Sequence, residues 1–95
     1  SLISPLDEKE NLTNVAHSKD YARLLTMDSG GYFKLWDISD VKEKSLYRAN
    51  FRELCFIRAH KKGIAGGSVF LFEQNYYVAT GSADKDVKLF TETGN

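Results

Sequence analysis

Three side chains in the second half of the chain have the functional groups of a nucleophilic triad. Thr80 offers a hydroxyl, His60 an imidazole base and Asp84 a carboxylate. A hydroxyl becomes a nucleophile when an imidazole takes its proton, and a carboxylate holds that imidazole in the right tautomer. Thr80, however, is flanked by residues typical of a β-strand, where its hydroxyl is better explained as a hydrogen-bonding group. We therefore interpret the three residues as structural and expect no catalytic residue.

Two other groups of residues have the composition of a metal or phosphate site without its spacing. Cys55, His17 and His60 carry groups that can ligate zinc, but no two of them have the short spacing of zinc ligands. Residues 63–68 (GIAGGS) follow Lys61 and Lys62. A phosphate-binding loop instead places its lysine after the glycines and directly before Ser or Thr. The sequence predicts neither a metal site nor a bound cofactor.

A basic stretch is the feature with the most open functional meaning. Residues 42–62 hold seven bases and two acids, although the whole chain is balanced at 13 Lys plus Arg against 13 Asp plus Glu. Because the charges balance, the whole chain has no net electrostatic attraction to nucleic acid or to a membrane surface. The stretch is either a solvated face or a docking patch for an acidic partner, such as a tubulin tail, an acidic helix or RNA. Interleaved aromatic residues favour a protein partner. The candidate contact residues are Arg48, Arg52, Arg58, Lys61 and Lys62.

The composition is that of a folded, intracellular chain. Apolar residues make up 42% and aromatic residues 13% of the 95 residues, which is too rich for a disordered segment. A single cysteine excludes an internal disulfide and fits a reducing compartment. No apolar run approaches the roughly 18 residues of a membrane span, and residues 1–6 lack the pattern of a signal peptide. Because the chain starts at Ser1, we expect it to be a segment of a longer protein.

Short β-branched and aromatic runs between turn signals predict an all-β meander. The adjacent glycines in Asp28-Ser29-Gly30-Gly31 predict a tight hairpin, because glycine supplies the positive φ angles that such a turn requires. Residues 39–50 (SDVKEKSLYRAN) are charged and less patterned, so we expect a surface insertion with one helical turn. Seven strands are predicted, at residues 12–17, 23–27, 32–37, 53–59, 64–72, 76–82 and 87–91.

The chain contains an internal repeat. Residues 25–37 (LTMDSGGYFKLWD) align without a gap with residues 79–91 (ATGSADKDVKLFT). The offset is 54 residues, as 80 minus 26 for the two aligned threonines. A period of about 40–45 residues is usual for propeller repeats, and the excess is roughly the length of the charged insertion. Self-similarity at a fixed period indicates a repeat architecture.

The repeated run resembles the WD40 family, whose usual pattern is a small apolar pair, Ser or Thr, Gly-Ser, an acidic turn and Val-Arg-Leu-Trp-Asp. Trp36 and Asp37 match the pair that names the family, and Ala59-His60 stands where the family has Gly-His. The resemblance covers residues 8–93. In this family an Asp holds a His, the His holds a Ser or Thr, and that hydroxyl meets the Trp N–H, so each buried polar group gains a partner.

The resemblance implies a different network in each repeat. The second repeat has Asp84, His60 and Thr80, but Phe90 replaces the tryptophan and offers no donor. The first repeat has Thr26 and Trp36, whereas Gly30 and Glu8 occupy the places of the Asp and the His, so its network is altered. The expected structural network is therefore His60, Thr80, Asp84, Thr26 and Trp36.

The resemblance also implies an all-β WD40 propeller fold with about one complete four-stranded blade and three strands of the next. We expect a lead-in segment at 1–11, a blade at 12–59 with its insertion at 39–50, and an incomplete blade at 60–95. A propeller closes with about four to eight blades, so this chain would be an arc whose remaining blades come from a parent chain.

The function implied is a non-catalytic scaffold that binds other proteins of a multiprotein complex. The closing VKLFTETG, the Arg58-Ala59-His60 entry and the long insertion are similar to the large WD-repeat proteins of cilia and flagella. That similarity implies cytoskeletal or axonemal location, with microtubule-associated partners. The alternative is the substrate-recognition propeller of an enzyme complex such as a ubiquitin ligase. A third hypothesis, a free-standing small β enzyme, predicts that the chain melts cooperatively as a monomer.

Overall fold

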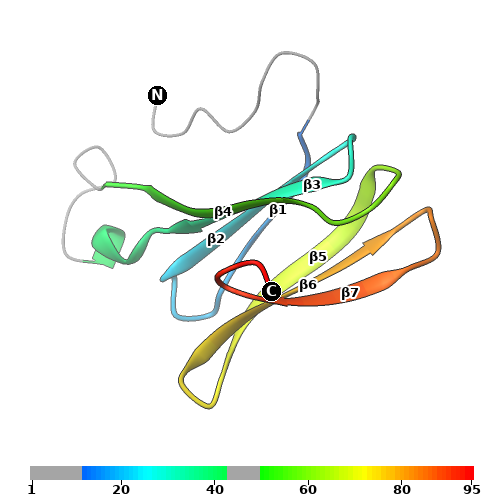
Figure 1. Ribbon diagram of the computed structural model, residues 1–95. Coiled ribbons are helices and arrows are strands. Elements are labelled where there is room, and N and C mark those ends of the chain that lie inside the picture. The colour runs from blue at the N-terminus through cyan, green and yellow to red at the C-terminus, as the bar shows by residue number, and fades with distance from the viewer. Residues whose placement is uncertain (1–11, 43–49) are drawn as a thin grey trace.

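The computed structural model describes residues 12–42 and 50–95 and is all-β, as predicted (Figure 1). The lead-in segment at 1–11 and residues 43–49 lie outside the described part. A short 3-10 helix, η1 (Ser39–Lys42), gives the helical turn expected in the insertion. Within residues 12–42 and 50–95, no helix is long or apolar enough to cross a membrane. The strands are β1 (Leu12–His17), β2 (Arg23–Asp28), β3 (Tyr32–Asp37), β4 (Arg52–Arg58), β5 (Ile64–Phe72), β6 (Asn75–Ser82) and β7 (Val87–Thr91).

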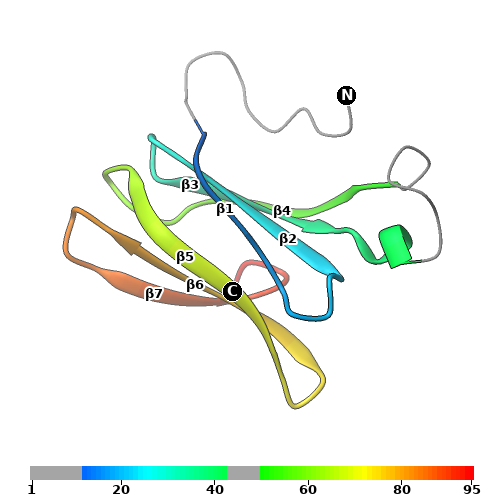
Figure 2. The same cartoon turned by 180° about the vertical axis from the view of Figure 1, so that it is seen from behind.

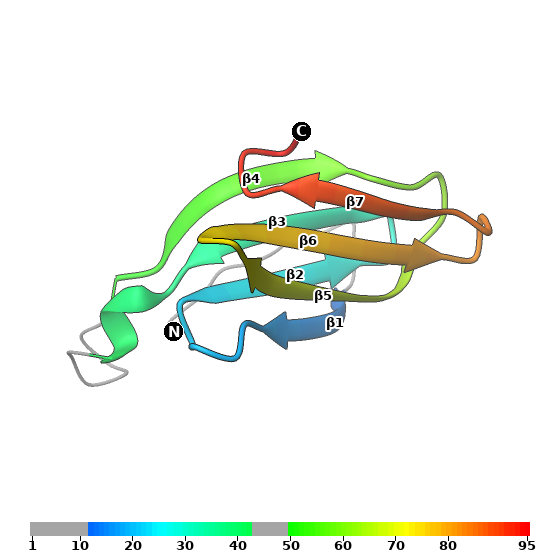
Figure 3. The same cartoon turned by 90° about the horizontal axis from the view of Figure 1, so that it is seen from below.

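Two antiparallel sheets contain these strands. The first has the order β1-β2-β3-β4 and the second the order β5-β6-β7, so each is a simple meander. The first strands of the two sheets lie beside each other (Figure 2). There Thr13 Oγ1 donates to the carbonyl of Ile64 at 3.0 Å, and Asn14 Nδ2 donates to the carbonyl of Ala65 at 2.9 Å. The view from below shows the second sheet stacked on the first in the same strand order (Figure 3).

The β2–β3 turn forms as predicted but depends on one glycine rather than two. Gly31 has a φ of +88°, whereas Gly30 is not among the described residues with positive φ. The Asp28 carboxylate holds the turn, since its Oδ1 accepts from the backbone N–H groups of Gly30 and Tyr32, both at 2.9 Å. A short polar side chain that bonds backbone groups two or more residues ahead is a common turn device. The turn is therefore fixed by a carboxylate and a single glycine.

Alternation along the predicted strand places Leu54, Phe56 and Arg58 on one side and Cys55 and Ile57 on the other, and this prediction is wrong at Leu54. The register between β3 and β4 shifts where Cys55 and Glu53 face Leu35 and Trp36, which leaves Leu54 as the extra residue. Leu54 packs against the core together with Cys55 and Ile57 instead of pointing away from them. The strand also spans 52–58 rather than 53–59, because Arg52 pairs with Asp37 at its start, whereas the Ala59 N–H donates to the carbonyl of Gly31 in the β2–β3 turn at 2.8 Å. A bulge of this kind moves one side chain to the other face of a strand.

The core lies between the two sheets. Phe33 from β3 contacts Phe90 from β7, with ring centroids 5.1 Å apart. Gly67 leaves no room for a side chain, since a methyl group there would lie 2.7 Å from the Ala79 carbonyl oxygen in the same sheet and 2.7 Å from the Met27 sulfur in the other. Aliphatic and aromatic burial of this extent is the main stabilising contribution to folding. The buried core residues are Leu25, Met27, Phe33, Leu35, Ala59, Ile64, Val69 and Val78.

Candidate functional site

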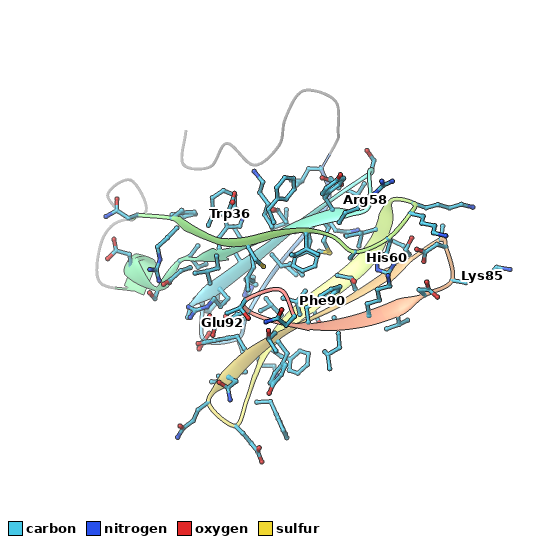
Figure 4. All side chains as sticks on the ribbon, viewed as in Figure 1. Trp36, Arg58, His60, Lys85, Phe90 and Glu92 are labelled. Atoms are coloured by element: carbon cyan, nitrogen blue, oxygen red, sulfur yellow. The ribbon has the colours of Figure 1, made fainter. Side chains whose placement is uncertain are left out.

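His60, Thr80 and Asp84 meet at the end of the second sheet, and each comes from a different element (Figure 4). His60 lies in the loop between β4 and β5, Thr80 in β6, and Asp84 in the turn between β6 and β7. The His60 Nε2 atom is 2.8 Å from Thr80 Oγ1, and Nδ1 is 3.1 Å from Asp84 Oδ2. A carboxylate only accepts hydrogen bonds, so Nδ1 carries a proton and donates it to Asp84, and Nε2 shares a hydrogen bond with the threonine hydroxyl.

The Asp84 carboxylate also binds two backbone groups, which joins the loop to the turn. It accepts from the N–H of Asp86 at 2.9 Å and from the N–H of Lys61 at 3.2 Å. The hydrogen bond from Asp86 is the main cause that holds the pKa of this carboxyl below its ordinary value, with further lowering from Lys61 and His60 and an opposing effect of burial. Asp84 is therefore a charged anchor for two loops.

The first sheet holds a second hydrogen bond between predicted site residues. Trp36 Nε1 donates to Thr26 Oγ1 at 3.1 Å, and both side chains are buried. Gly30 uses its N–H to bind Asp28, and Glu8 lies outside the described residues. In the second sheet, Phe90 occupies the position equivalent to Trp36 and contributes its ring to the core instead. The two sheets thus share a threonine at equivalent places but give it different partners.

Comparisons with protein-family models, curated proteins and solved structures gave no match. The WD40 resemblance therefore stays a prediction.

The burial of the three-residue set decides what it can do chemically. Thr80 is 1% exposed and His60 is 3% exposed. A nucleophile has to reach the reacting atom of a substrate, and a hydroxyl buried to this degree is closed to one. A groove of about 470 Å³ lies elsewhere, lined by His17, Lys19, Asp20 and residues 68–71. The arrangement suits a buried structural network better than a triad.

The residues considered for a metal site do not come together. His17 stacks on Tyr21 with ring centroids 4.6 Å apart, and its Nδ1 lies 2.8 Å from the Ser18 carbonyl oxygen. Cys55 is partly buried beside the core, and this burial raises the pKa of its thiol, which disfavours the thiolate that binds metals. No group of three or more His, Cys, Asp and Glu side chains able to hold a metal occurs in residues 12–42 and 50–95.

The basic stretch does not form one patch in the described structure. Arg52 begins β4 and pairs with Asp37, with Nη2 3.0 Å from Oδ2. Arg58 ends β4, and its guanidinium lies 5.6 Å from the centre of the Tyr32 ring. The bulge in β4 also turns Arg52 and Arg58 to opposite faces. Lys61 and Lys62 are exposed near Arg58, whereas Arg48 lies outside the described residues.

A polar seam between the sheets was missed by the sequence analysis. Arg23 donates to Glu92 through Nη2 at 3.1 Å and to Asp37 through Nη1 at 3.3 Å, and its guanidinium covers the Tyr76 ring at 4.2 Å. Tyr76 in turn donates a short hydrogen bond to Asp20, and burial followed by this bond raises the pKa of its hydroxyl. Arg23 and Asp37 are directly paired across the β2–β3 hairpin, so this contact could have been predicted from the register of the two strands.

Removing the Thr80 hydroxyl tests whether the buried set stabilises the fold. Thr80→Val keeps the shape of the side chain but leaves His60 Nε2 without its hydrogen-bond partner, so we expect a loss of about 1–3 kcal/mol in the free energy of unfolding. Urea unfolding measures this loss. Thr93→Val, which removes an exposed hydroxyl, is the matched control and should change stability by less than about 0.5 kcal/mol. Equal effects of the two substitutions would contradict a stabilising role of the set.

Proposed function

We propose that this chain is a non-catalytic protein interaction scaffold and forms an arc of a WD-type β-propeller. The observation that carries the proposal is the buried, fully partnered set of His60, Thr80 and Asp84, which ties two loops together at one end of the second sheet. A rigid end with fixed loops suits the presentation of a contact surface, because binding then orders few side chains. The low exposure of the set favours this role over catalysis.

The relation between the sheets further supports the propeller proposal. Both sheets are meanders, and the chain returns from the last strand of the first sheet, β4, to a strand beside β1 and β2. Repeat proteins are built from successive units of the same strand order, each of which covers the next. A Greek-key sandwich instead moves strands between its sheets. The axonemal assignment and the parent chain with further blades are part of the same proposal.

The contact surface that we propose lies at the end of the molecule near His60. Arg58, Lys61, Lys62 and Lys85 are all exposed there, and the hydrogen bond from the Lys61 N–H to Asp84 holds the β4–β5 loop against the β6–β7 turn (Figure 4). Exposed cations on loops fixed in this way attract acidic segments and speed their encounter. We therefore propose an acidic protein segment as the partner.

A binding experiment with the full chain tests this proposal. The probe is a fluorescent glutamate-rich peptide of about 12 residues, followed by anisotropy as the salt concentration is raised. We expect binding at low salt that weakens as salt screens the charges. Lys62→Glu should weaken binding about fivefold, which corresponds to about 1 kcal/mol for reversing one exposed charge. Lys61→Glu should have a similar effect.

The control variant is Lys19→Glu, which reverses an exposed charge in the β1–β2 turn at the opposite end of the sheets. It should bind the peptide like the unmodified chain. If Lys19→Glu weakens binding as much as Lys62→Glu, the attraction is not specific to the end near His60. If the peptide does not bind at low salt, the proposed partner is wrong. Turnover of an activated ester that is lost in Thr80→Val would favour the enzyme hypothesis.

A further inference from the structure

One face of the second sheet is exposed, apolar and free of charge. It is the face of β5–β7 that points away from the first sheet, and we call it the outer face. Val87 is 83% exposed, Leu89 62%, Phe72 58% and Phe70 39%. The strand positions that alternate with the core residues carry no Asp, Glu, Lys or Arg. Tyr77 joins the two phenylalanines, with ring centroids 5.8 and 6.5 Å away. An exposed apolar patch of this kind marks an interaction surface.

The internal repeat indicates what kind of element covers this face. With the offset of 54 residues, Val87 is equivalent to Phe33 and Leu89 to Leu35. Phe33 is 1% exposed and Leu35 is 0% exposed, because the second sheet lies on them. The same positions are therefore covered by a β-sheet in the first repeat and left open in the second. A β-sheet is the element that fits the outer face.

We propose that a second copy of this chain supplies that sheet, so that two outer faces pack against each other around a two-fold axis. Two uncharged faces can meet without burying an unpaired charge or opposing like charges. The face of the first sheet that points away from the second sheet, which we call the far face, fits less well. Its Glu53 and Arg58 lie on β4, a strand with no equivalent in the second sheet, and its Trp36 is already buried. A two-fold contact uses the same patch on both copies and is the commonest arrangement of homo-oligomers.

The size of the outer face predicts a weak dimer. Three strands about 4.8 Å apart and roughly 15–20 Å long give a flat area of about 300 Å² per copy. The protruding side chains add accessible surface to this area. The pair would bury less than the roughly 1,200 Å² of a stable specific interface. We therefore expect association only at about 0.1 mM and above. In a longer chain, a following sheet would compete with the second copy for this face.

Sedimentation velocity of the full chain from about 0.01 to 1 mM tests the proposal. The mass should rise from 10.7 kDa toward twice that value and no further. Leu89→Lys should weaken the association at least tenfold without changing the melting temperature, because it places two like charges in the interface of an otherwise unchanged monomer. Val15→Lys is the matched control, since Val15 is 55% exposed but lies on the far face of the first sheet. It should leave the association unchanged.

Three results would overturn the two-fold dimer. The first is a monomer at every concentration. The second is equal weakening by Val15→Lys, and the third is growth beyond a dimer, since both of these indicate head-to-tail stacking of unlike faces. This inference does not rest on the proposed function. It concerns the outer face as residues 1–95 leave it, before any further blade covers it, whereas the acidic peptide is expected at the loops near His60. If the chain binds the peptide but does not form the dimer, only the dimer proposal is wrong. If it forms the dimer but does not bind the peptide, only the proposed partner is wrong.

Discussion

Replacing Phe33 with alanine is expected to lower the free energy of unfolding by about 3–5 kcal/mol. The Phe33 side chain is 1% exposed and lies between the sheets against Phe90, so its removal leaves a cavity that two rigid sheets cannot close. Domains of this size are stable by only about 5–15 kcal/mol, so the variant would lose much of its folded population at room temperature. Urea unfolding followed by tryptophan fluorescence measures the change through Trp36.

Phe56→Ala provides the comparison for the Phe33 variant. Phe56 is 49% exposed on the far face of the first sheet, where it covers the Tyr32 ring at 5.1 Å and lies under the Lys34 ammonium. Its truncation removes one aromatic pair and leaves no closed cavity, so we expect a loss of about 1 kcal/mol. Similar losses for the two variants would mean that the sheets do not pack through Phe33.

Gly31→Ala is expected to be the other severe substitution, with a loss of about 3 kcal/mol or more. Gly31 has a φ of +88°, a conformation that costs a residue with a Cβ atom free energy. A methyl group at this position would also lie 2.0 Å from the carbonyl oxygen of His60 and 2.7 Å from that of Lys62. Because both obstacles are backbone atoms, the β4–β5 loop would have to move and would take His60 with it.

Gly66→Ala is the control for this effect. A methyl group on Gly66 meets nothing within 4 Å, and Gly66 is not one of the described glycines with a positive φ. It should leave the thermal midpoint within a few degrees of the unmodified chain. The ring signals of His60 in an NMR spectrum provide a second readout and should shift only in Gly31→Ala. If Gly31→Ala melts like Gly66→Ala, the β2–β3 turn does not pack against the β4–β5 loop as described.

The strands and the first hairpin could be predicted because their determinants are local. Apolar and aromatic runs between turn signals mark β2, β3 and β6, and the adjacent glycines after Asp28 mark the turn between the first two. The place of Leu54 could not be read from alternation, because a bulge appears only when β4 is aligned with β3. The all-β class thus follows from the sequence, whereas the face on which each β4 side chain lies does not.

The site residues divide in the same way. His60, Thr80 and Asp84 were predicted from the resemblance to WD40 repeats, which assigns a hydrogen-bonded network to these positions. The contacts of Arg23 with Glu92 and of Tyr76 with Asp20 join residues 69 and 56 positions apart and follow no local pattern. The basic stretch is continuous in sequence, but a strand about 20 Å long carries Arg52 and Arg58 to opposite ends. Proximity along the chain therefore does not make Arg52 and Arg58 neighbours on the surface.

The position of Arg23 has a consequence for how the molecule comes apart. Its ion pair with Glu92 holds the Thr91 end of the second sheet to the first sheet through attraction between charges, and its pair with Asp37 anchors the guanidinium within the first sheet. Dissolved salt screens such attraction over about 10 Å at 0.1 M, whereas the buried hydrogen bonds of His60 at the other end are screened much less. Rising ionic strength would therefore fray the β6–β7 hairpin from Thr91 toward Val87. Amide exchange should quicken first at the end of the chain that holds Glu92.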